Sequence, residues 1–229
     1  MSALLPSYIQ KGTDARKDLD VTYGILLKSI PFKPFSELKD LPVRDWPDEQ
    51  GDDEYIPANP VFKAYETSVE LIYTGLTNTA RQMIYSMLQY IQGAEFNIFD
   101  TFKRTGIRCR YVGYEDSAYY NKERQSVEFS VKVKVNNPLS YGIPLDLGSF
   151  SAYCECNMTL YWADGTSDVK TQGDIVSETI IAGNEFLIVV PSKLATINSL
   201  NWADSLVRLT TTGYDRILSY TGVRYVPSA

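Results

Sequence analysis

The densest group of side chains with chemistry to offer is an acidic cluster in a proline-rich stretch. Five carboxylates fall within seven residues, in Asp48-Glu49-Gln50-Gly51-Asp52-Asp53-Glu54. Carboxylates can bind a hard cation or, as a pair, hydrolyse a glycosidic bond. The cluster lacks the D-x-[DN]-x-[DN]-G spacing that curls a loop around calcium, and 28 acidic residues in the chain leave no way to select one catalytic pair. The sequence therefore predicts neither a metal site nor a catalytic residue here.

Other groups that commonly carry catalysis are missing or sparse. The chain has no histidine, which removes the commonest general base and metal ligand. Its three cysteines are too few for a disulfide scaffold, and Cys154 and Cys156 do not form a Cys-x-x-Cys pair. We interpret the cysteines as buried structural thiols. No glycine-rich phosphate loop occurs, and we predict that the protein is not an enzyme and needs no cofactor.

Composition narrows the kind of partner. The net charge of -6 argues against non-specific nucleic-acid binding, which requires a basic surface. Met1–Gln10 lacks the pattern of a signal peptide, and no apolar stretch approaches the length of a membrane span. The 17 tyrosines suit both strands and contact surfaces, because the ring packs while the hydroxyl stays hydrated.

Two stretches with alternating polarity predict the central strands of a sheet. In Val127–Val135 every odd-numbered residue is apolar and every even-numbered one is polar. Phe62–Thr74 resumes the strand pattern, with one face formed by Tyr65, Thr67, Val69, Leu71 and Tyr73 and the other by Glu66, Ser68 and Glu70. A strand turns successive side chains to opposite faces, so each stretch has one dry and one charged face. We predict that the two strands pair, which would bring acids opposite lysines: Glu66 and Glu70 against Lys132 and Lys134.

Helical spacing appears once. Apolar residues recur along one stripe at Ala80, Met83, Ile84, Met87, Leu88 and Ile91. This predicts a helix over residues 79–92 that covers the dry face of the sheet. Glu95–Phe102 and Ile107–Tyr114 predict a hairpin, and Val21–Leu27 predicts a short strand.

The C-terminal part predicts a second, smaller β unit. A glycine- and proline-containing linker, Pro138–Gly148, precedes an alternating strand from Phe150 to Trp162 that ends at an Asp-Gly turn. Glu178–Ile181 and Phe186–Val190 predict a hairpin. Two closing strands are predicted at Leu206–Thr212 and Ile217–Val226.

The predicted fold class is mainly β with one inserted α-helix. Residues 1–140 form a helix-backed β-sandwich domain with the helix at 79–92 and a long arm at 31–60. Residues 141–229 form a small β-sandwich domain. The arm holds six prolines together with aromatic residues, and a loop of this length in a compact domain is usually functional or ordered by a partner.

Charge is distributed unevenly between the arm and the sheet. Between Lys103 and Lys134, eight basic residues face four acids, whereas Asp48–Glu54 carries five acids and no base. Ordinary solvated charge is one interpretation. Contact between the acidic arm of one subunit and the basic sheet of another is the alternative. The candidate subunit-interface residues are Trp46, Asp52, Asp53, Glu54, Tyr55, Arg108, Arg110, Lys132 and Lys134.

The order of these elements resembles structural proteins of phage tails. Strand Phe62–Thr74, a helix, a hairpin and V-E-F-S-V-K-V-K-V-N-N-P at 127–138 are similar to the tail-tube-like unit of distal tail proteins. In that family a smaller β domain follows the unit, and a long inter-strand segment like Arg44–Tyr55 is present. The similarity covers roughly residues 20–140 at the level of element order.

The resemblance implies a structural role in the virion tail. It implies a homo-oligomeric ring, a hexamer, that joins the tail tube to the baseplate or tip and is assembled in the cytoplasm of the bacterial host. It implies no catalytic, cofactor-binding or metal-binding residue, no specific binding to nucleic acid and no membrane span. The partners would be further copies of the chain and the neighbouring tail tube and baseplate or tip proteins.

Two other classes of function stay open on the sequence alone. A carbohydrate-binding β-sandwich module of a cell-surface or adhesion protein could stack sugars on Trp162 or Trp202. Trp162 continues the apolar face of its strand, which favours core packing for that residue. An enzyme that uses carboxylates is the third possibility, and it would need a convergent acid pair in a pocket.

Overall fold

The structure is a computed structural model of the chain. It describes residues 7–31, 33, 36–40, 43–45, 52–54, 61–76, 78–100, 105–121, 126–145, 147–154, 156–182, 184–192, 206–209 and 214–216. Of these, 43–45, 52–54, 116–121, 206–209 and 214–216 are described by their backbone alone. Strands dominate the described residues, which confirms the predicted mainly-β class.

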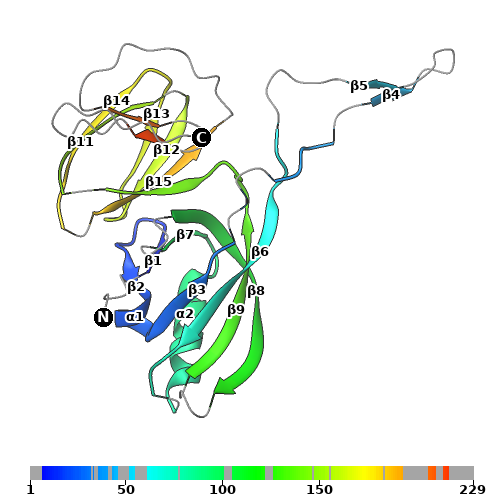
Figure 1. Cartoon of the computed structure of the whole chain (residues 1–229), viewed down its shortest axis with the longest axis vertical. Helices are drawn as coiled ribbons and strands as arrows, with labels where there is room; N and C mark the ends of the chain where they lie inside the picture. Colours follow the sequence, from blue (N-terminus) through cyan, green and yellow to red (C-terminus); the bar gives the residue numbers. More distant parts are fainter. Residues whose placement is uncertain are drawn as a thin grey trace.

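A seven-stranded antiparallel sheet organises the N-terminal part (Figure 1). Its spatial order is β2-β1-β7-β8-β9-β6-β3. The strands are β1 (Tyr8–Lys11), β2 (Lys17–Asp18), β3 (Ile25–Ser29), β6 (Tyr65–Tyr73), β7 (Glu95–Asp100), β8 (Thr105–Asn121) and β9 (Ser126–Val135).

The predicted pairing of the two alternating stretches is confirmed. β6 and β9 pair antiparallel over nine residues without a register shift, and Glu66 lies opposite Lys134. Glu70 lies opposite Ser130 rather than opposite a lysine. The apolar residues at odd-numbered positions of both strands are buried, among them Val69, Leu71 and Phe129, except Val127, which is half-buried. The period of two therefore assigned both faces correctly.

A bulge at Val112 keeps the long strand β8 in phase with β9. The register shifts between Tyr111 and Gly113, so Val112 has no partner on β9. Tyr111 and, beyond the bulge, Tyr114 both pack against the core, and Val112 is 40% exposed. Without the extra residue, Gly113 would face the core and Tyr114 would face outward, because a one-residue slip exchanges the two faces of a strand.

The inner face of the sheet is covered by α2 (Ala80–Ile91), the helix that the apolar stripe predicted. Ile84, Met87 and Leu88 are buried against the sheet, together with Val131 and Val133 of β9. Met83, which also belongs to the apolar stripe, is partly buried and packs against this core.

A second, short helix was not predicted. α1 (Leu19–Tyr23) occupies part of the stretch predicted as a strand at Val21–Leu27, and the strand β3 begins only at Ile25. Gly24 ends α1 with φ +65°, a left-handed conformation that favours glycine. The alternation of Val21, Tyr23 and Ile25 misled because Leu19 and Tyr23, four residues apart, are the buried pair of one helical turn.

The C-terminal part consists of two four-stranded sheets that face each other. One has the order β10-β15-β12-β13 and the other β14-β11-β16-β17. The strands are β10 (Tyr141–Pro144), β11 (Gly148–Cys154), β12 (Met158–Trp162), β13 (Ser167–Lys170), β14 (Ile175–Ile180), β15 (Phe186–Pro191), β16 (Leu206–Leu209) and β17 (Tyr214–Arg216). The two sheets enclose their own buried cluster, which includes Leu160, Trp162, Val176 and Leu187.

Three predictions for this part are wrong in detail. The predicted linker contains β10, and the strand predicted from Phe150 to Trp162 is two strands in different sheets, β11 and β12. The alternation continues across the break because both strands present their even-numbered residues to the same core. The predicted hairpin of Glu178–Ile181 and Phe186–Val190 does not exist, since β14 and β15 belong to different sheets.

Other predictions lie at or beyond the described residues. The predicted strand Leu206–Thr212 corresponds to β16, which pairs parallel with β11. The predicted strand Ile217–Val226 lies outside the described residues. In the arm, β4 (Val43–Asp45) and β5 (Asp52–Glu54) pair antiparallel, and Figure 1 shows this hairpin apart from the other sheets. The division of the chain into 1–140 and 141–229 stays a prediction.

Reactivity of the thiols follows from their position. Cys109, Cys154 and Cys156 are fully buried thiols that form no disulfide bond. Burial raises the pKa of the Cys109 thiol, and it raises the pKa of Cys154 to about 12 from an ordinary value of 9.0. The thiolate is the reactive form, so both effects suppress reaction. We expect none of the three thiols to react with Ellman's reagent in the native protein and all three to react after denaturation; one equivalent of fast reaction would contradict this.

Candidate functional site

The sheet face opposite α2, here called the outer face, is divided into rows by the register of its strands. Tyr8, Phe99 and Gly106 form one row across β1, β7 and β8. Gln10, Asn97 and Arg108 form the next row. The first two rows are covered by the C-terminal sheets, and the rows beyond them are open.

The first row makes an apolar contact with the outer side of β15. The ring of Phe186 stacks on Phe99, with centroids 4.6 Å apart and an interplanar angle of 10°, and on Tyr8 at 5.6 Å. Ile188 and Ala163 complete this buried cluster, which we call the junction cluster. Because apolar surface and ring stacking both favour contact, the junction cluster joins the N-terminal and C-terminal parts.

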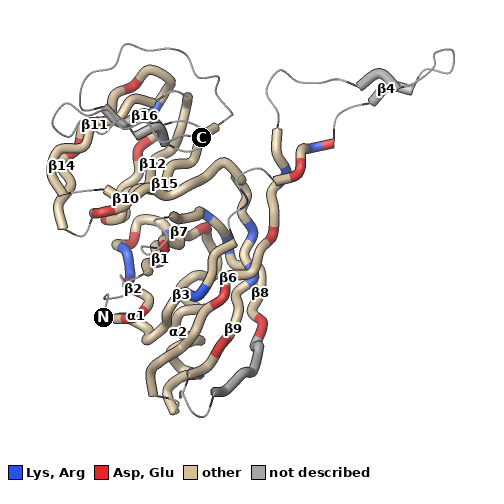
Figure 2. Tube along the Cα trace, viewed as in Figure 1, with Lys and Arg blue, Asp and Glu red and all other residues tan. Residues whose placement is uncertain are grey.

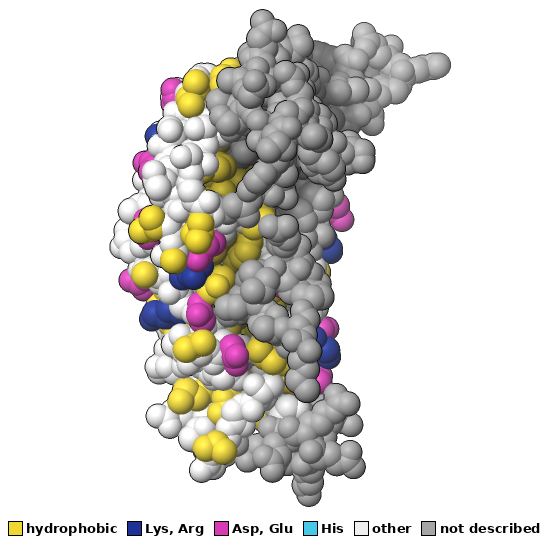
Figure 3. Space-filling view, turned by 60° about the vertical axis from the view of Figure 1, so that its left-hand side comes forward, with side chains coloured by type: hydrophobic (Ala, Val, Ile, Leu, Met, Phe, Trp, Pro, Cys, Tyr) yellow, Lys and Arg dark blue, Asp and Glu magenta, His cyan; other side chains and the backbone are white. Residues whose placement is uncertain are grey.

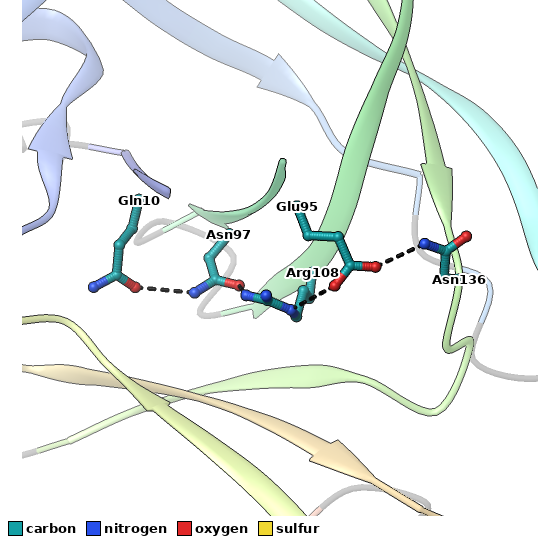
Figure 4. Close-up of polar contacts among 5 residues, drawn as sticks. All are labelled: Gln10, Glu95, Asn97, Arg108 and Asn136. Atoms are coloured by element: carbon teal, nitrogen blue, oxygen red, sulfur yellow. Dashed lines mark hydrogen bonds and ion pairs between the residues drawn. The ribbon is translucent and has the colours of Figure 1, made fainter. Parts of the chain in front are cut away.

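The second row forms a chain of polar contacts along the edge of the junction cluster (Figure 4). Asn97 Nδ2 donates to Gln10 Oε1 at 2.9 Å, and Arg108 Nη1 donates to Asn97 Oδ1 at 3.1 Å. Arg108 Nε binds Glu95 Oε2 at 3.0 Å, and Asn136 Nδ2 donates to Glu95 Oε1 at 2.7 Å. The two fully buried members, Gln10 and Asn97, therefore have hydrogen-bond partners for their amide groups.

Two members of this chain reach across to the C-terminal part. Gln10 Nε2 donates to the carbonyl oxygen of Trp162 at 2.6 Å, and the guanidinium of Arg108 lies 3.8 Å from the ring centre of Tyr161. An ion pair between Arg16 and Glu185, 2.7 Å long, closes the other side of the junction. The contacts are directional, so they fix the orientation of the two parts as well as their association.

Two glycines allow β8 and β10 to approach closely at the junction. A Cβ atom added to Gly142 would lie 2.7 Å from the backbone nitrogen of Gly106 and 2.9 Å from Ile188 Cδ1. The obstructing atoms are backbone and a buried side chain, which cannot move aside without shifting a strand.

We expect Gly142→Ala to lower the free energy of unfolding by about 1–3 kcal/mol, the usual cost of overpacking. Urea denaturation measures this change. Gly113→Ala is the matched control, because its Cβ would meet nothing closer than Lys132 Cβ at 4.0 Å. Equal stability of Gly142→Ala and wild type would show that β8 and β10 are not in close contact.

The remaining part of the outer face is exposed and charged, and we call it the open face. It runs over β8, β9 and β6 (Figure 2). Its residues are Arg110, Lys132, Lys134, Glu66, Ser68, Glu70, Glu115, Ser130 and Glu128.

Charge on the open face is polarised along the strands. The row nearest the junction places Arg110 beside Lys134, with Glu66 as the next neighbour on β6. Glu70 and Glu115 lie two rows further along, both opposite Ser130. The bases of the three strands therefore lie in the two rows nearest the junction, where Glu95 and Glu66 flank Arg110 and Lys134. The rows further along carry acids, and Lys28 of β3 binds Glu128 there at 3.1 Å.

Ion pairs hold some of these charges in place. Lys132 binds Glu115, and this contact raises the pKa of the lysine through the hydrogen bond and the attraction between the charges, with a smaller effect from Glu66. The bond with Glu128 raises the pKa of Lys28 in the same way. Such exposed pairs contribute little to stability but define the pattern of charge that a partner meets.

The structure brings together some of the predicted interface residues and separates others. Arg110, Lys132 and Lys134 lie side by side on the open face. Arg108, on β8 like Arg110, points into the junction, where its side chain is 14% exposed. Asp52, Asp53 and Glu54 form β5, whose side chains are not described, and Trp46 and Tyr55 lie outside the described residues.

Sequence reasoning missed the residues that build the junction. Gln10, Asn97 and Tyr161 were not selected, and Arg108 was placed with the other bases. The one available signal was the alternation of Asn97 with Ile98 and of Arg108 with Ile107, which places Asn97 and Arg108 together on the outer face of the sheet. Trp162, a candidate for sugar stacking, is buried at 3% exposure, and its ring is nearly perpendicular to that of Phe150, so that candidate role is wrong. Trp202 lies outside the described residues.

Comparison with known solved structures gives a distant structural similarity. No family model matches the chain, and no curated protein sequence matches it. Among solved structures, the chain is similar to the Dit protein of phage SPP1, described as a paradigm of the hub adsorption apparatus in phages that infect Gram-positive bacteria. The TM-score is 0.39 and the identity 10%, over 80% of this chain and 79% of the other. Among the described residues, no helix is long and apolar enough to cross a membrane.

Proposed function

We propose that the protein is a structural component of a phage or prophage tail, not an enzyme, and that it forms a homo-oligomeric ring between the tail tube and the baseplate or tip. The observation that supports this best is the open face. It presents regularly spaced charges of both signs on the most extensively paired strands of the protein, β6, β8 and β9. A rigid, charged sheet face suits repeated contact with an identical neighbour.

The junction supports the same proposal. A building block of a ring must keep a constant shape, because a heterologous contact closes only at one rotation angle. The stacked rings, the polar chain and the ion pair hold the two parts of this chain in one orientation. The arm, with its acidic sequence, is the proposed partner of the bases on the open face of the next subunit.

Electron microscopy of negatively stained protein, together with light scattering at high concentration, tests the proposal. Rings of uniform diameter are the expected result. A protein that stays monomeric at high concentration and also with its tail neighbours present would overturn it.

Charge reversal tests the contribution of the open face. We expect Lys132→Glu to weaken ring assembly at least roughly tenfold, because it removes a base from the open face and places an acid opposite the acidic arm of the next subunit. Arg81→Glu, an equal change on the exposed side of α2, is the matched control and should assemble normally. Circular dichroism must show that both variants are folded. Normal assembly of Lys132→Glu would exclude this face from the contact.

A further inference from the structure

The strand β14 forms a regular sheet edge. It pairs with β11 over six consecutive residues without a register shift. Among the described strands, none pairs with its other side. Its sequence, Ile175-Val176-Ser177-Glu178-Thr179-Ile180, contains no proline, glycine or lysine and is rich in residues that favour strands. The backbone N–H and C=O groups on the side of β14 away from β11 can therefore pair with a further strand.

Three other edge strands of the structure carry features that oppose such pairing. β3 has a register shift at Lys28, β10 ends in Pro144, and β13 has only four residues with Asp168 and Lys170 among them. Irregularity, proline and charge are the usual means of protecting an edge strand. β14 has one such feature, Glu178, an exposed acid on the side of the strand that carries the buried Val176 and Ile180.

The sequence of β14 reads the same, in chemical terms, in both directions from Glu178. On one side the order is isoleucine, hydroxyl, hydroxyl, isoleucine: Ile175, Ser177 and Thr179 of β14, followed by Ile181, the residue directly after the strand. On the other side it is aliphatic, acid, aliphatic: Val176, Glu178 and Ile180. A strand with this symmetry matches a second copy of itself in antiparallel orientation.

We propose that two copies of the chain associate through their β14 edges, antiparallel, about a two-fold axis that passes beside Glu178. In this register Ile175 lies opposite Ile181 of the second copy, Val176 opposite Ile180, and Ser177 opposite Thr179. Directly opposed side chains share a face of the sheet, so apolar groups meet apolar groups and hydroxyls meet hydroxyls. The contact is isologous and therefore distinct from the heterologous contact of a ring.

Exposed apolar side chains at the ends of the edge support this choice of partner. Ile175 is 62% exposed and Ile181 is 66% exposed. Leu147, which directly precedes β11 and lies beside Ile181, is 64% exposed. Figure 3 turns this side of the molecule forward and shows apolar side chains at the surface between charged ones. Pairing would cover apolar side chains at both ends of the strand, while the two Glu178 carboxylates at the centre oppose it.

Cross-linking through an introduced cysteine tests the register. In Glu178→Cys the two new thiols lie directly opposite each other at the axis, within the Cα separation that a disulfide requires. In Ser177→Cys they lie about 8 Å apart, which is beyond that limit. The native thiols are buried and do not compete. We expect a covalent dimer from Glu178→Cys under oxidised glutathione and little or none from Ser177→Cys; the reverse order, or no dimer from either variant, overturns the proposal.

Sedimentation velocity of the unmodified contact provides a second test. We expect Glu178→Thr to associate about two- to tenfold more tightly than wild type, because a like-charge pair is removed and strand propensity rises. The double variant Ile175→Lys/Ile181→Lys should abolish association, since each lysine then faces a lysine.

Val169→Lys is the matched control, because Val169 is 80% exposed on the edge strand β13 of the same part and should not affect association. Equal association of all variants overturns the proposal. The β14 substitutions leave the open face unchanged, so rings that persist in Ile175→Lys/Ile181→Lys distinguish failure of this contact from failure of the proposed function.

Discussion

Replacing Phe186 with alanine should lower the free energy of unfolding by about 3–5 kcal/mol, the usual cost of deleting a buried phenylalanine ring. Phe186 is 1% exposed and stacks on both Phe99 and Tyr8. It lies in the junction cluster rather than in either of the two separate cores. The loss should therefore appear in the coupling between the two parts as well as in overall stability.

Differential scanning calorimetry measures both effects. We expect the wild type to unfold in one transition, because each part contributes to the junction cluster. In Phe186→Ala we expect two separated transitions at lower temperatures, since each core then unfolds on its own. Phe186→Leu is the conservative control, which keeps most of the apolar contact and loses the stacking, and should stay near wild type with one transition. A single, unshifted transition in Phe186→Ala would show that the junction cluster does not couple the parts.

The central sheet could be predicted because its strands have one dry and one charged face. Val131, Lys132 and Val133 alternate without interruption, and a period of two then assigns burial residue by residue. The helix α2 was predictable for the parallel reason, a single apolar stripe. Both signals are local, so a single sequence contains them in full.

The arrangement of strands into sheets was harder to predict because alternation carries no information about the partner. Phe150 and Trp162 belong to one unbroken alternation, yet they lie on strands of two different sheets and face the same core. A strand that crosses from one sheet to the other keeps its inward parity, so the pattern does not mark the crossing. The missing hairpin of β14 and β15 has the same cause.

The junction could not be predicted from the sequence for a different reason. On the strands β7 and β8, Asn97 and Arg108 occupy positions that an exposed strand would fill with polar residues. They are covered because the C-terminal part packs there, which is a long-range event with no local signature. The candidate basic surface therefore contained one residue, Arg108, that serves a contact within the chain.

Replacing Arg108 with methionine should lower the free energy of unfolding by about 2–4 kcal/mol, somewhat below the usual cost of breaking a buried ion pair because Glu95 is partly exposed. The side chain of Arg108 is 14% exposed and that of Glu95 is 36% exposed. The substitution removes the guanidinium group, which donates hydrogen bonds to Glu95 and to the side-chain oxygen of Asn97. It also removes the contact between this guanidinium and the ring of Tyr161. Urea denaturation measures the loss, and methionine keeps much of the apolar volume, so a cavity does not account for it.

A double-mutant cycle separates the ion pair from the rest of the contact. If Glu95 depends on Arg108, Arg108→Met/Glu95→Gln should cost less than the two single substitutions together, by about 0.5–3 kcal/mol. Arg110→Met, two residues further along the same face and exposed, should change stability by no more than about 0.5 kcal/mol. Additive effects of Arg108→Met and Glu95→Gln would mean that the polar chain does not act as a unit. The orientation of the two parts would then depend mainly on the stacked rings of the junction cluster and on the ion pair between Arg16 and Glu185.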